Sequence, residues 1–403
     1  MLMVFEIENG VLRKYIDNGE EKVTLPRGID EIGKEVFYGC RTIKEITVPD
    51  GVKKIGNGAF KNMFSLKKAV LPDSVMEAGS ELFYGCEKLE EVNIPKHLEE
   101  IPEMMFLRCF ELRHIEIPKS VKKIGTKAFY GAGIEEIVLP DGVTKAENGI
   151  FSYCTSLKRA VLPETLEEIG YDLFFGCEEL EETRLPEKTR TLGGGTFMNC
   201  RKLKEAYIPP FLERLPNNMF NGCSFEKVII PETVTEITYA SFRECGNLKY
   251  IEFEKRAKPP RIADFTTSKV GAFARSYPVV KLKANFLFRN PSMLFYDEFY
   301  FEKKHYHQVV HVVNENRYWF VDRIFYAAYE KNKEWHYFRT LKVLTEYGEP
   351  EDVKNYFGQV RSKVTSENLL ELIEIARKNE RTETQMILMD FYTESFGSQR
   401  LEL

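Results

Sequence analysis

The sequence predicts an α/β repeat protein, in which a strand-rich solenoid of about ten repeats precedes a small all-α domain. Three observations support this prediction. One phenylalanine recurs at a nearly fixed interval, and one proline recurs with the same interval. Beyond about residue 290 that interval is lost, and apolar residues take helical spacing instead.

The recurring phenylalanine anchors each repeat. Prolines from Pro26 to Pro231 keep the same interval, with shortened steps at the same two places. A period near 23 residues is typical of leucine-rich repeat solenoids, because one repeat buries its apolar face only against its neighbours. The phenylalanines, separated by 22 or 23 residues, are Phe37, Phe60, Phe83, Phe106, Phe129, Phe151, Phe174, Phe197, Phe220 and Phe242.

Each repeat predicts two extended passes. In one unit, Leu112, Ile115 and Ile117 have the spacing of a turn that leads into a short strand with alternate residues in the core. Pro118 ends that strand, because proline has no N–H to donate. A second pass follows, and Gly125 is expected to allow the tight bend after it.

The whole unit reads L-x-x-V-x-I-P-x-x-V-x-x-I-G-x-x-A-F-x-G-C, and it resembles the BspA-type leucine-rich repeats of bacterial and treponemal surface proteins. The resemblance covers roughly residues 22 to 254. It implies a repeat coil that binds proteins, with adhesion or host-protein binding at a cell surface.

We predict four parts of the chain. Residues 1–25 form an N-terminal cap with a hairpin over Asn9-Gly10, and residues 26–254 form the solenoid. Residues 255–289 form a degenerate repeat that caps the coil, and residues 290–403 form a helical domain. Apolar residues at i, i+3, i+4 and i+7 predict its helices: Val321, Ile324, Phe325 and Ala328; Val353, Tyr356, Phe357 and Val360; Leu369, Leu372, Ile373 and Ala376.

Helix boundary signals agree with this spacing. Pro350 suits the first turn of one predicted helix, and Thr365 or Ser366 can cap the next. The final two predicted helices span residues 367–378 and 383–392, and they are similar to the terminal helix pairs of ankyrin-like arrays.

Composition and charge exclude several function classes. The formal net charge of -5 supplies no general basic face, so we expect no nucleic-acid partner. No secretory signal and no apolar stretch long enough to span a membrane are visible, so we expect a cytoplasmic protein.

The eight cysteines all stand three residues after the repeat aromatic. Met63 and Ala132 occupy that place in the remaining repeats, which indicates a small buried apolar slot. We therefore predict reduced, buried thiols rather than disulfides or zinc ligands.

The best candidate site is the concave sheet, where each repeat projects two side chains away from the core. Around Arg184, the side chains that point outward are more apolar than is usual for exposed positions. Such a mixture of aliphatic, Tyr and Arg side chains is favoured at interface hot spots. The alternative is that β-branched residues merely suit a strand surface. The candidate partner-binding residues are Val138, Val161, Arg184, Tyr207, Ile229, Arg159 and Tyr250.

Catalytic and cofactor signals are weak. His305, His307 and His311 lie near two glutamates, Glu298 and Glu302, and a helix would bring His307 and His311 onto one face as metal ligands. Without an H-E-x-x-H motif, structural histidines are favoured. The triplet Gly193-Gly194-Gly195 occupies a repeat turn with no Lys-Ser/Thr after it, which argues against a phosphate loop.

The sequence thus predicts a non-enzymatic scaffold, without cofactor or metal, that binds an unknown protein partner on the concave sheet. Two alternatives remain open. The chain could be an adhesin-like surface protein exported without a recognisable signal, or a metal-dependent enzyme or sensor that uses the histidines of its helical domain.

Overall fold

The computed structural model describes residues 4–210, 212–238, 240–254, 260–262, 279–283, 308–314, 317–323, 338, 341–342, 344–346 and 350–396. The chain is a β-solenoid of about ten turns followed by a short C-terminal helical region, as the sequence predicts. It divides into two compact units, Met1–Phe225 and Glu226–Leu403. The domain boundaries predicted at residues 25, 254 and 289 stay predictions.

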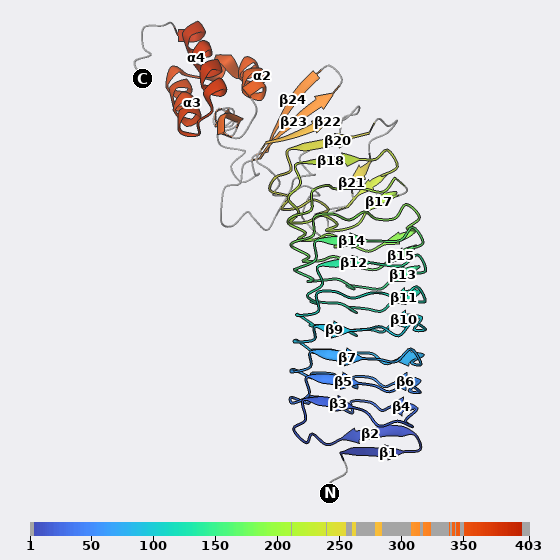
Figure 1. Ribbon diagram of the computed structural model, residues 1–403. Helices are drawn as coiled ribbons and strands as arrows, with labels where there is room; N and C mark the ends of the chain where they lie inside the picture. The colour runs from blue at the N-terminus through green and yellow to red at the C-terminus, as the bar shows by residue number, and fades with distance from the viewer. Residues whose placement is uncertain are drawn as a thin grey trace. The chain divides into compact units, whose positions relative to one another are not determined.

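The first unit begins with the predicted hairpin. Strands β1 (Phe5–Glu8) and β2 (Val11–Tyr15) pair antiparallel across Asn9-Gly10, both of which have positive φ, as a tight two-residue turn requires. Strand β2 continues into the coil by pairing in parallel with β4 (Glu31–Ile32). Leu12 is fully buried, so the hairpin covers the first rung of the coil (Figure 1).

Each repeat of the first unit makes a first pass just before its proline. The central side chain of each strand points into the core and its two neighbours point outward, because side chains alternate along a strand. The first-pass strands are β3 (Lys22–Thr24), β5 (Glu45–Thr47), β7 (Lys68–Val70), β9 (Glu91–Val92), β12 (Glu136–Val138) and β14 (Arg159–Val161).

A second pass follows each proline, and these passes form two stacks of parallel, in-register strands, over residues 31–78 and 100–192 (Figure 1). Each of these strands is two residues long. Beyond β4 they are β6 (Lys54–Ile55), β8 (Glu77–Ala78), β10 (Glu100–Ile101), β11 (Lys123–Ile124), β13 (Lys145–Ala146), β15 (Glu168–Ile169), β16 (Thr191–Leu192) and β17 (Arg214–Leu215).

The first-pass sheet is interrupted between β9 and β12. The side-chain amide of Asn93 accepts a hydrogen bond from the Leu71 N–H at 2.9 Å and donates one to the Leu71 carbonyl at 2.7 Å. These backbone groups are thereby satisfied by a side chain rather than by a strand. The next rung, around His114, forms no strand.

The core of the first unit is a stack of the recurring phenylalanines. Neighbouring rings from Phe37 to Phe220 stack with centroids 5.3 to 5.7 Å apart. All eight cysteines are free and buried, which confirms the prediction of reduced thiols. Cys86 illustrates the arrangement, since its Sγ donates to the Phe60 carbonyl at 3.0 Å.

The glycine after the second pass has a role other than the predicted one. Gly125 does not adopt a positive φ, so the expectation that it permits a tight bend is wrong. Its backbone instead lies against the preceding rung, and a Cβ atom there would meet the Glu103 nitrogen at 2.6 Å. Gly79 is equally close to Asn57, at 2.4 Å. Glycine is needed because adjacent rungs approach closely.

The second unit also contains two sets of parallel strands. Parallel pairing connects β18 (Lys227–Ile230) to β20 (Tyr250–Phe253), and β20 to β22 (Val279–Lys283); β19 (Glu236–Ile237) pairs with β21 (Arg261–Ile262).

The prediction that residues 290–403 form a helical domain is wrong for residues 308–314 and 317–323. Strands β23 (Gln308–Asn314) and β24 (Arg317–Arg323) form an antiparallel hairpin that extends the sheet from β22. Val321, placed on a helix by its spacing, lies in β24, and the other three residues of that set lie outside the described residues. The run Q-V-V-H-V-V-N is rich in β-branched residues, which favour strands.

The predicted C-terminal helices are present. They are α2 (Pro350–Val360), α3 (Ser366–Lys378) and α4 (Thr382–Phe396), with a short 3₁₀ turn at Arg361–Lys363. Pro350 opens α2 and Thr365 caps α3 through a capping box, as predicted. The apolar residues predicted for both helices form one buried cluster with Leu388 and Tyr392 of α4.

Candidate functional site

The sheet that was expected to line the concave side is the sheet of first-pass strands. We call its outward surface in the first unit the first-pass face; it consists of the two outward side chains on each rung from Lys22 to Tyr207. In-register stacking places residues one repeat apart side by side, at a strand spacing of about 4.8 Å. The chemistry of the face therefore depends on which side chains occupy the same position in successive repeats.

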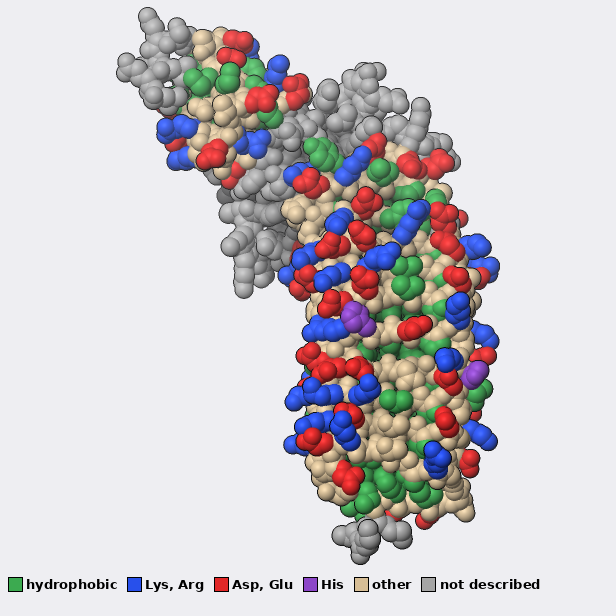
Figure 2. All heavy atoms as spheres, in the orientation of Figure 1, with side chains coloured by type: hydrophobic (Ala, Val, Ile, Leu, Met, Phe, Trp, Pro, Cys, Tyr) green, Lys and Arg blue, Asp and Glu red, His purple; other side chains and the backbone are tan. Residues whose placement is uncertain are grey.

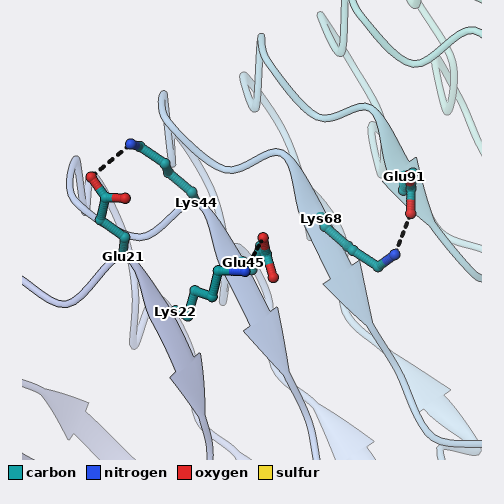
Figure 3. A network of polar contacts seen from close by, with 6 residues as sticks. All are labelled: Glu21, Lys22, Lys44, Glu45, Lys68 and Glu91. Atoms are coloured by element: carbon teal, nitrogen blue, oxygen red, sulfur yellow. Dashed lines mark hydrogen bonds and ion pairs between the residues drawn. The ribbon is translucent and has the colours of Figure 1, made fainter.

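Near the N-terminus the first-pass face pairs its own charges. The Lys22 Nζ lies 2.8 Å from a Glu45 carboxylate oxygen of the next rung, and Lys68 pairs with Glu91 in the same way. Figure 3 shows these pairs beside a third, between Glu21 and Lys44, at the start of the same strands. Figure 2 shows acidic and basic side chains interspersed along the coil.

Such exposed pairs contribute little to stability. Their consequence here is that the charges are mutually neutralised, so this part of the face offers no free ion to a partner.

This pairing ends before β12 and β14. Glu136 lies in register with Arg159, yet their side chains make no ion pair or hydrogen bond within the described residues. Beside them, Val138 is 58% exposed and lies in register with the half-buried Val161. Unpaired charges next to exposed aliphatic side chains distinguish this segment from the paired segment before it.

A hollow of about 490 Å³ opens next to this segment. Three successive rungs carry the small residues Ala160, Thr183 and Ala206 at the central core position, where Ile46 and Ile137 stand elsewhere. We call this space the Arg159 hollow, and its lining residues include Arg159, Val161, Glu164, Glu182, Arg184 and Glu205.

Regular pairing of the first-pass sheet also weakens at the hollow. Beyond β14 the first passes of the first unit have only isolated bridge residues in place of strands, among them the bridge between Arg159 and Glu182. The hydroxyl oxygen of Thr183, which lines the hollow, is buried and has no hydrogen-bond partner. Because Thr183 stands at the central position of its rung, this hydroxyl is an unsatisfied polar group of the interior rather than of the outward face.

Arg184 is held in place at the edge of the hollow. Its guanidinium donates to the Tyr207 hydroxyl at 2.8 Å, and its Cζ lies 4.2 Å from the centre of the Tyr207 ring. It also lies 3.1 Å from a Glu187 carboxylate oxygen. The hydrogen bond to Tyr207 is the main reason that the pKa of Arg184 is raised, so this guanidinium is a fixed cation with partners of its own.

The structure thus brings five of the seven predicted residues onto one face: Val138, Arg159, Val161, Arg184 and Tyr207. The other two lie in the second unit. Ile229 on β18 is 44% exposed, and Tyr250 on β20 is half-buried. Whether any of these residues binds a partner stays a prediction.

Of the three histidines, only His311 lies in the described part of the chain. It lies in strand β23 rather than on a helix, so the helical position expected for it is wrong. His305 and His307 lie outside the described residues. Within the parts that the structure describes, no three His, Cys, Asp or Glu side chains gather where they could hold a metal ion.

The glycine triplet has a structural role. Gly193 lies against the preceding rung, where a Cβ would meet the Tyr171 nitrogen at 2.4 Å. Gly195 adopts a φ of +69°, in the left-handed region that favours glycine. No helix follows the triplet within the first unit, which agrees with its interpretation as a repeat turn.

Sequence reasoning overlooked Thr183 and the glutamates that line the hollow. No signal in the sequence identifies them, because alanine also occupies the same core position at Ala69.

Comparisons with known proteins agree with the repeat architecture. The family model of BspA type leucine rich repeat regions matches residues 15–135 and 122–249, in six copies. No curated protein matches the chain. In the described parts of the chain, no helix has the length and apolar character needed to cross a membrane.

Several solved structures are similar. A leucine-rich repeat protein from Bacteroides ovatus has a TM-score of 0.53 and 26% identity, over 70% of this chain and 69% of that one. A leucine rich cell surface protein from Faecalibacterium prausnitzii has a TM-score of 0.46 and 23% identity, over 73% and 96%. The leucine-rich repeat protein of T. pallidum has a TM-score of 0.38 and 26% identity, over 50% and 89%.

Proposed function

The chain belongs to the BspA-type leucine-rich repeat family, and on that premise we propose that it is a non-enzymatic scaffold that binds a protein partner on the first-pass face. Leucine-rich repeat folds are typical of binding proteins, because stacked repeats present an extended surface. The proposed binding segment runs from β12 to Tyr207 and includes the Arg159 hollow.

One observation carries the proposal: the change in the first-pass face at β12. Before it, charged neighbours such as Lys68 and Glu91 satisfy one another. On β12 and β14, exposed Val138 and partly exposed Val161 stand beside Glu136 and Arg159, which have no side-chain partner among the described residues. A partner would bury the valines and supply the missing counter-charges.

Binding on such a face needs no covalent chemistry. The partner's apolar side chains would displace water from the valines, while the Arg184–Tyr207 stack offers a pre-ordered wall. A side chain that is already ordered costs little conformational entropy when a partner packs against it. Arg and Tyr are also enriched at interface hot spots.

A capture experiment tests this function. A Val138→Asn, Val161→Asn variant keeps the charge of the face but removes its apolar contact, and Val70→Asn is a matched control on β7, where the valine is 39% exposed beside a paired Lys68. Proteins captured from lysate of the native cells would be quantified by mass spectrometry. We expect the partner to be lost from the double variant and retained by the control; equal retention by both would refute the proposed face.

The cytoplasmic location stays a prediction, and the alternative is a surface protein exported without a recognisable signal. Fractionation of the native cells distinguishes them, since an adhesin would be recovered on intact cells and accessible to added protease.

A further inference from the structure

We propose that residues 91–113, one rung of the coil, form a hinge at which the rungs before them tilt against the rungs after them. We call these residues the hinge rung. Three observations carry the proposal: a proline in place of a recurring glycine, the loss of one row of backbone hydrogen bonds on each side of the hinge rung, and a hollow at each of those two places. The hinge is independent of which face binds a partner.

The second-pass sheet is broken at Pro102. In the preceding repeat this place is occupied by Gly79, whose N–H donates to the Ile55 carbonyl of the rung before it at 2.8 Å. Proline has no N–H, so the equivalent hydrogen bond to the Ala78 carbonyl cannot form. The sheet accordingly ends at β8, and a separate sheet begins at β10.

The missing N–H, rather than the presence of a side chain, accounts for this break. Glu147 occupies the same place in a later repeat, and its N–H donates to the Ile124 carbonyl at 3.0 Å within a continuous sheet. Pro216 is the other proline at this place, and there the sheet ends again, between β16 and β17. Both interruptions of the second-pass sheet between β4 and β17 therefore coincide with a proline.

On the other side of the hinge rung, the first-pass sheet is broken instead. Strand β9 is the last of its sheet, and the rung around His114 forms no strand. Farther along, the Leu139 N–H donates to the Val161 carbonyl of the next rung at 3.0 Å. The equivalent bond, from the Ile94 N–H to the Glu116 carbonyl, is absent from this described stretch of the coil.

The hinge rung is thus held to each neighbour by one row of backbone hydrogen bonds instead of two. Strands β7 and β9 pair with the rung before it, and strands β10 and β11 pair with the rung after it. The ring stack is intact on both sides, since the Phe106 centroid lies 5.7 Å from that of Phe83 and 5.3 Å from that of Phe129. An interface that is fixed along one side and open along the other can tilt about the fixed side.

Packing is looser at both open sides. Val92 and Ile115 are half-buried, whereas Ile46 and Ile137, at the same core position of other rungs, are 1% and 2% exposed. A hollow of about 860 Å³ opens beside Val92, and a hollow of about 610 Å³ opens beside Pro102. Few backbone hydrogen bonds and incomplete burial are the features of regions that open locally in a folded protein.

The hinge rung lies between two parts of the first-pass face. The segment with paired charges ends at Glu91, and the proposed binding segment begins at β12. Tilting at the hinge rung changes the angle between these two segments. A partner that contacts both segments would therefore select one angle from those that the free protein adopts.

Distance measurement between two spin labels tests the hinge. Nitroxides on Lys54→Cys and Glu168→Cys of the full chain occupy exposed second-pass positions five rungs apart, about 24 Å at strand spacing, on either side of the hinge rung. The native cysteines are buried and so are poorly accessible to the label. Pro102→Gly supplies the missing N–H, and we expect double electron–electron resonance to show a shorter mean distance and a narrower distribution.

Pro216→Gly is the matched control, because it makes the same substitution at the same place in a repeat outside the labelled span. It should leave the distance distribution unchanged. Replacing proline by glycine ordinarily loosens a chain, so glycine itself does not explain a narrower distribution. An equal or broader distribution in Pro102→Gly, or the same narrowing in Pro216→Gly, would overturn the hinge.

Hydrogen exchange of the wild type tests the hinge without any substitution. Residues 91–101 and 45–55 are equivalent segments, two repeats apart, and the second of them lies among rungs that keep both rows of hydrogen bonds. Amides of residues 91–101 should exchange at least about fivefold faster, because each lost backbone hydrogen bond lowers the cost of local opening. Equal protection of the two segments would also reject the hinge.

Discussion

At the scale of single residues, the cysteine three residues after a repeat phenylalanine fills a small buried position and donates a hydrogen bond. Cys86 and Cys154 are fully buried, and each Sγ donates to a phenylalanine carbonyl of the preceding rung at 3.0 Å. Burial raises the pKa of each thiol to about 12, because the thiolate would lose its hydration inside the core. The same cause raises the pKa of Cys109, Cys177 and Cys200 well above the usual range.

This shift predicts that the protein loses stability at alkaline pH. In the unfolded chain these thiols ionise above about pH 8.5, while in the folded chain Cys86 and Cys154 keep their protons up to a pH of about 12. Unfolding therefore releases protons in this interval, and the stabilisation present below it is lost as pH rises. Each such thiol should lower the free energy of unfolding by roughly 1 kcal/mol per pH unit.

Denaturant unfolding at several pH values, in the presence of a reductant, measures this slope. Lysines and tyrosines also titrate there, so a Cys86→Ala, Cys154→Ala variant is the comparison, and Ala132 shows that alanine is accepted in this slot. The variant should have a smaller alkaline slope, and an unchanged slope would show that these thiols do not titrate differently on unfolding.

Single residues also mark the limit of prediction from the sequence. The cysteine slot could be predicted because its position repeats and accepts Met63 and Ala132. The role of Gly125 could not, because its close approach to Glu103 involves a residue of the preceding rung. Likewise, the missing ion pair between Glu136 and Arg159 depends on side-chain geometry across two rungs, which composition does not determine.

At the scale of elements, helices were predicted correctly where apolar residues at helical spacing were accompanied by a residue typical of a helix start. Helices α2 and α3 have Pro350 in the first turn and Thr365 as N-cap, and both were predicted. The set that begins at Val321 had helical spacing without such signals, and this residue lies in a strand. A short apolar run can form either a helix or a strand. Residues 308–314 form strand β23 because they are rich in β-branched side chains and pair with β22.

The cap of α3 gives a prediction at this scale. The Thr365 hydroxyl oxygen accepts a hydrogen bond from the Asn368 N–H at 3.2 Å. The Asn368 side-chain oxygen in turn accepts one from the Thr365 N–H at 3.5 Å. Thr365→Ala removes this acceptor and should destabilise the first turn of α3 by about 1 kcal/mol. Hydrogen exchange of that turn, followed by mass spectrometry, should then be roughly fivefold faster.

Thr365→Ser provides the control, because serine retains the hydroxyl and is an equally good N-cap. Exchange close to that of the wild type is expected for serine. If alanine and serine accelerated exchange equally, the hydroxyl would not be what stabilises the end of the helix.

At the scale of the whole molecule, the first unit behaves as a one-dimensional array, since each rung contacts its two neighbours. The phenylalanine stack links neighbouring rungs in this way. The ring centroid of Phe106 lies 5.7 Å from that of Phe83 and 5.3 Å from that of Phe129. Stability in such arrays is the sum of repeat terms and nearest-neighbour interface terms. The consequence of a weakened interface therefore depends on where in the array it lies.

This dependence predicts different unfolding behaviour for two chemically identical substitutions. Phe106→Ala and Phe37→Ala each remove a buried ring. Each should lower the free energy of unfolding of its own part of the array by about 3–5 kcal/mol. Phe37 lies next to the end of the array, where its other neighbour is the Tyr15 ring at 4.9 Å, so its loss frees only the N-terminal rung and hairpin. Phe106 lies within the array, and its loss weakens both interfaces that join the segments on either side.

We therefore expect Phe106→Ala to split the denaturant transition of the repeats into two steps, or to lower the slope of its free energy against denaturant. Phe37→Ala should leave the main transition nearly unchanged while the N-terminal amides exchange faster. Circular dichroism and hydrogen exchange measure these two effects. Identical single transitions shifted by the same amount in both variants would show that the coil unfolds as one unit, and the nearest-neighbour description would be wrong for this protein.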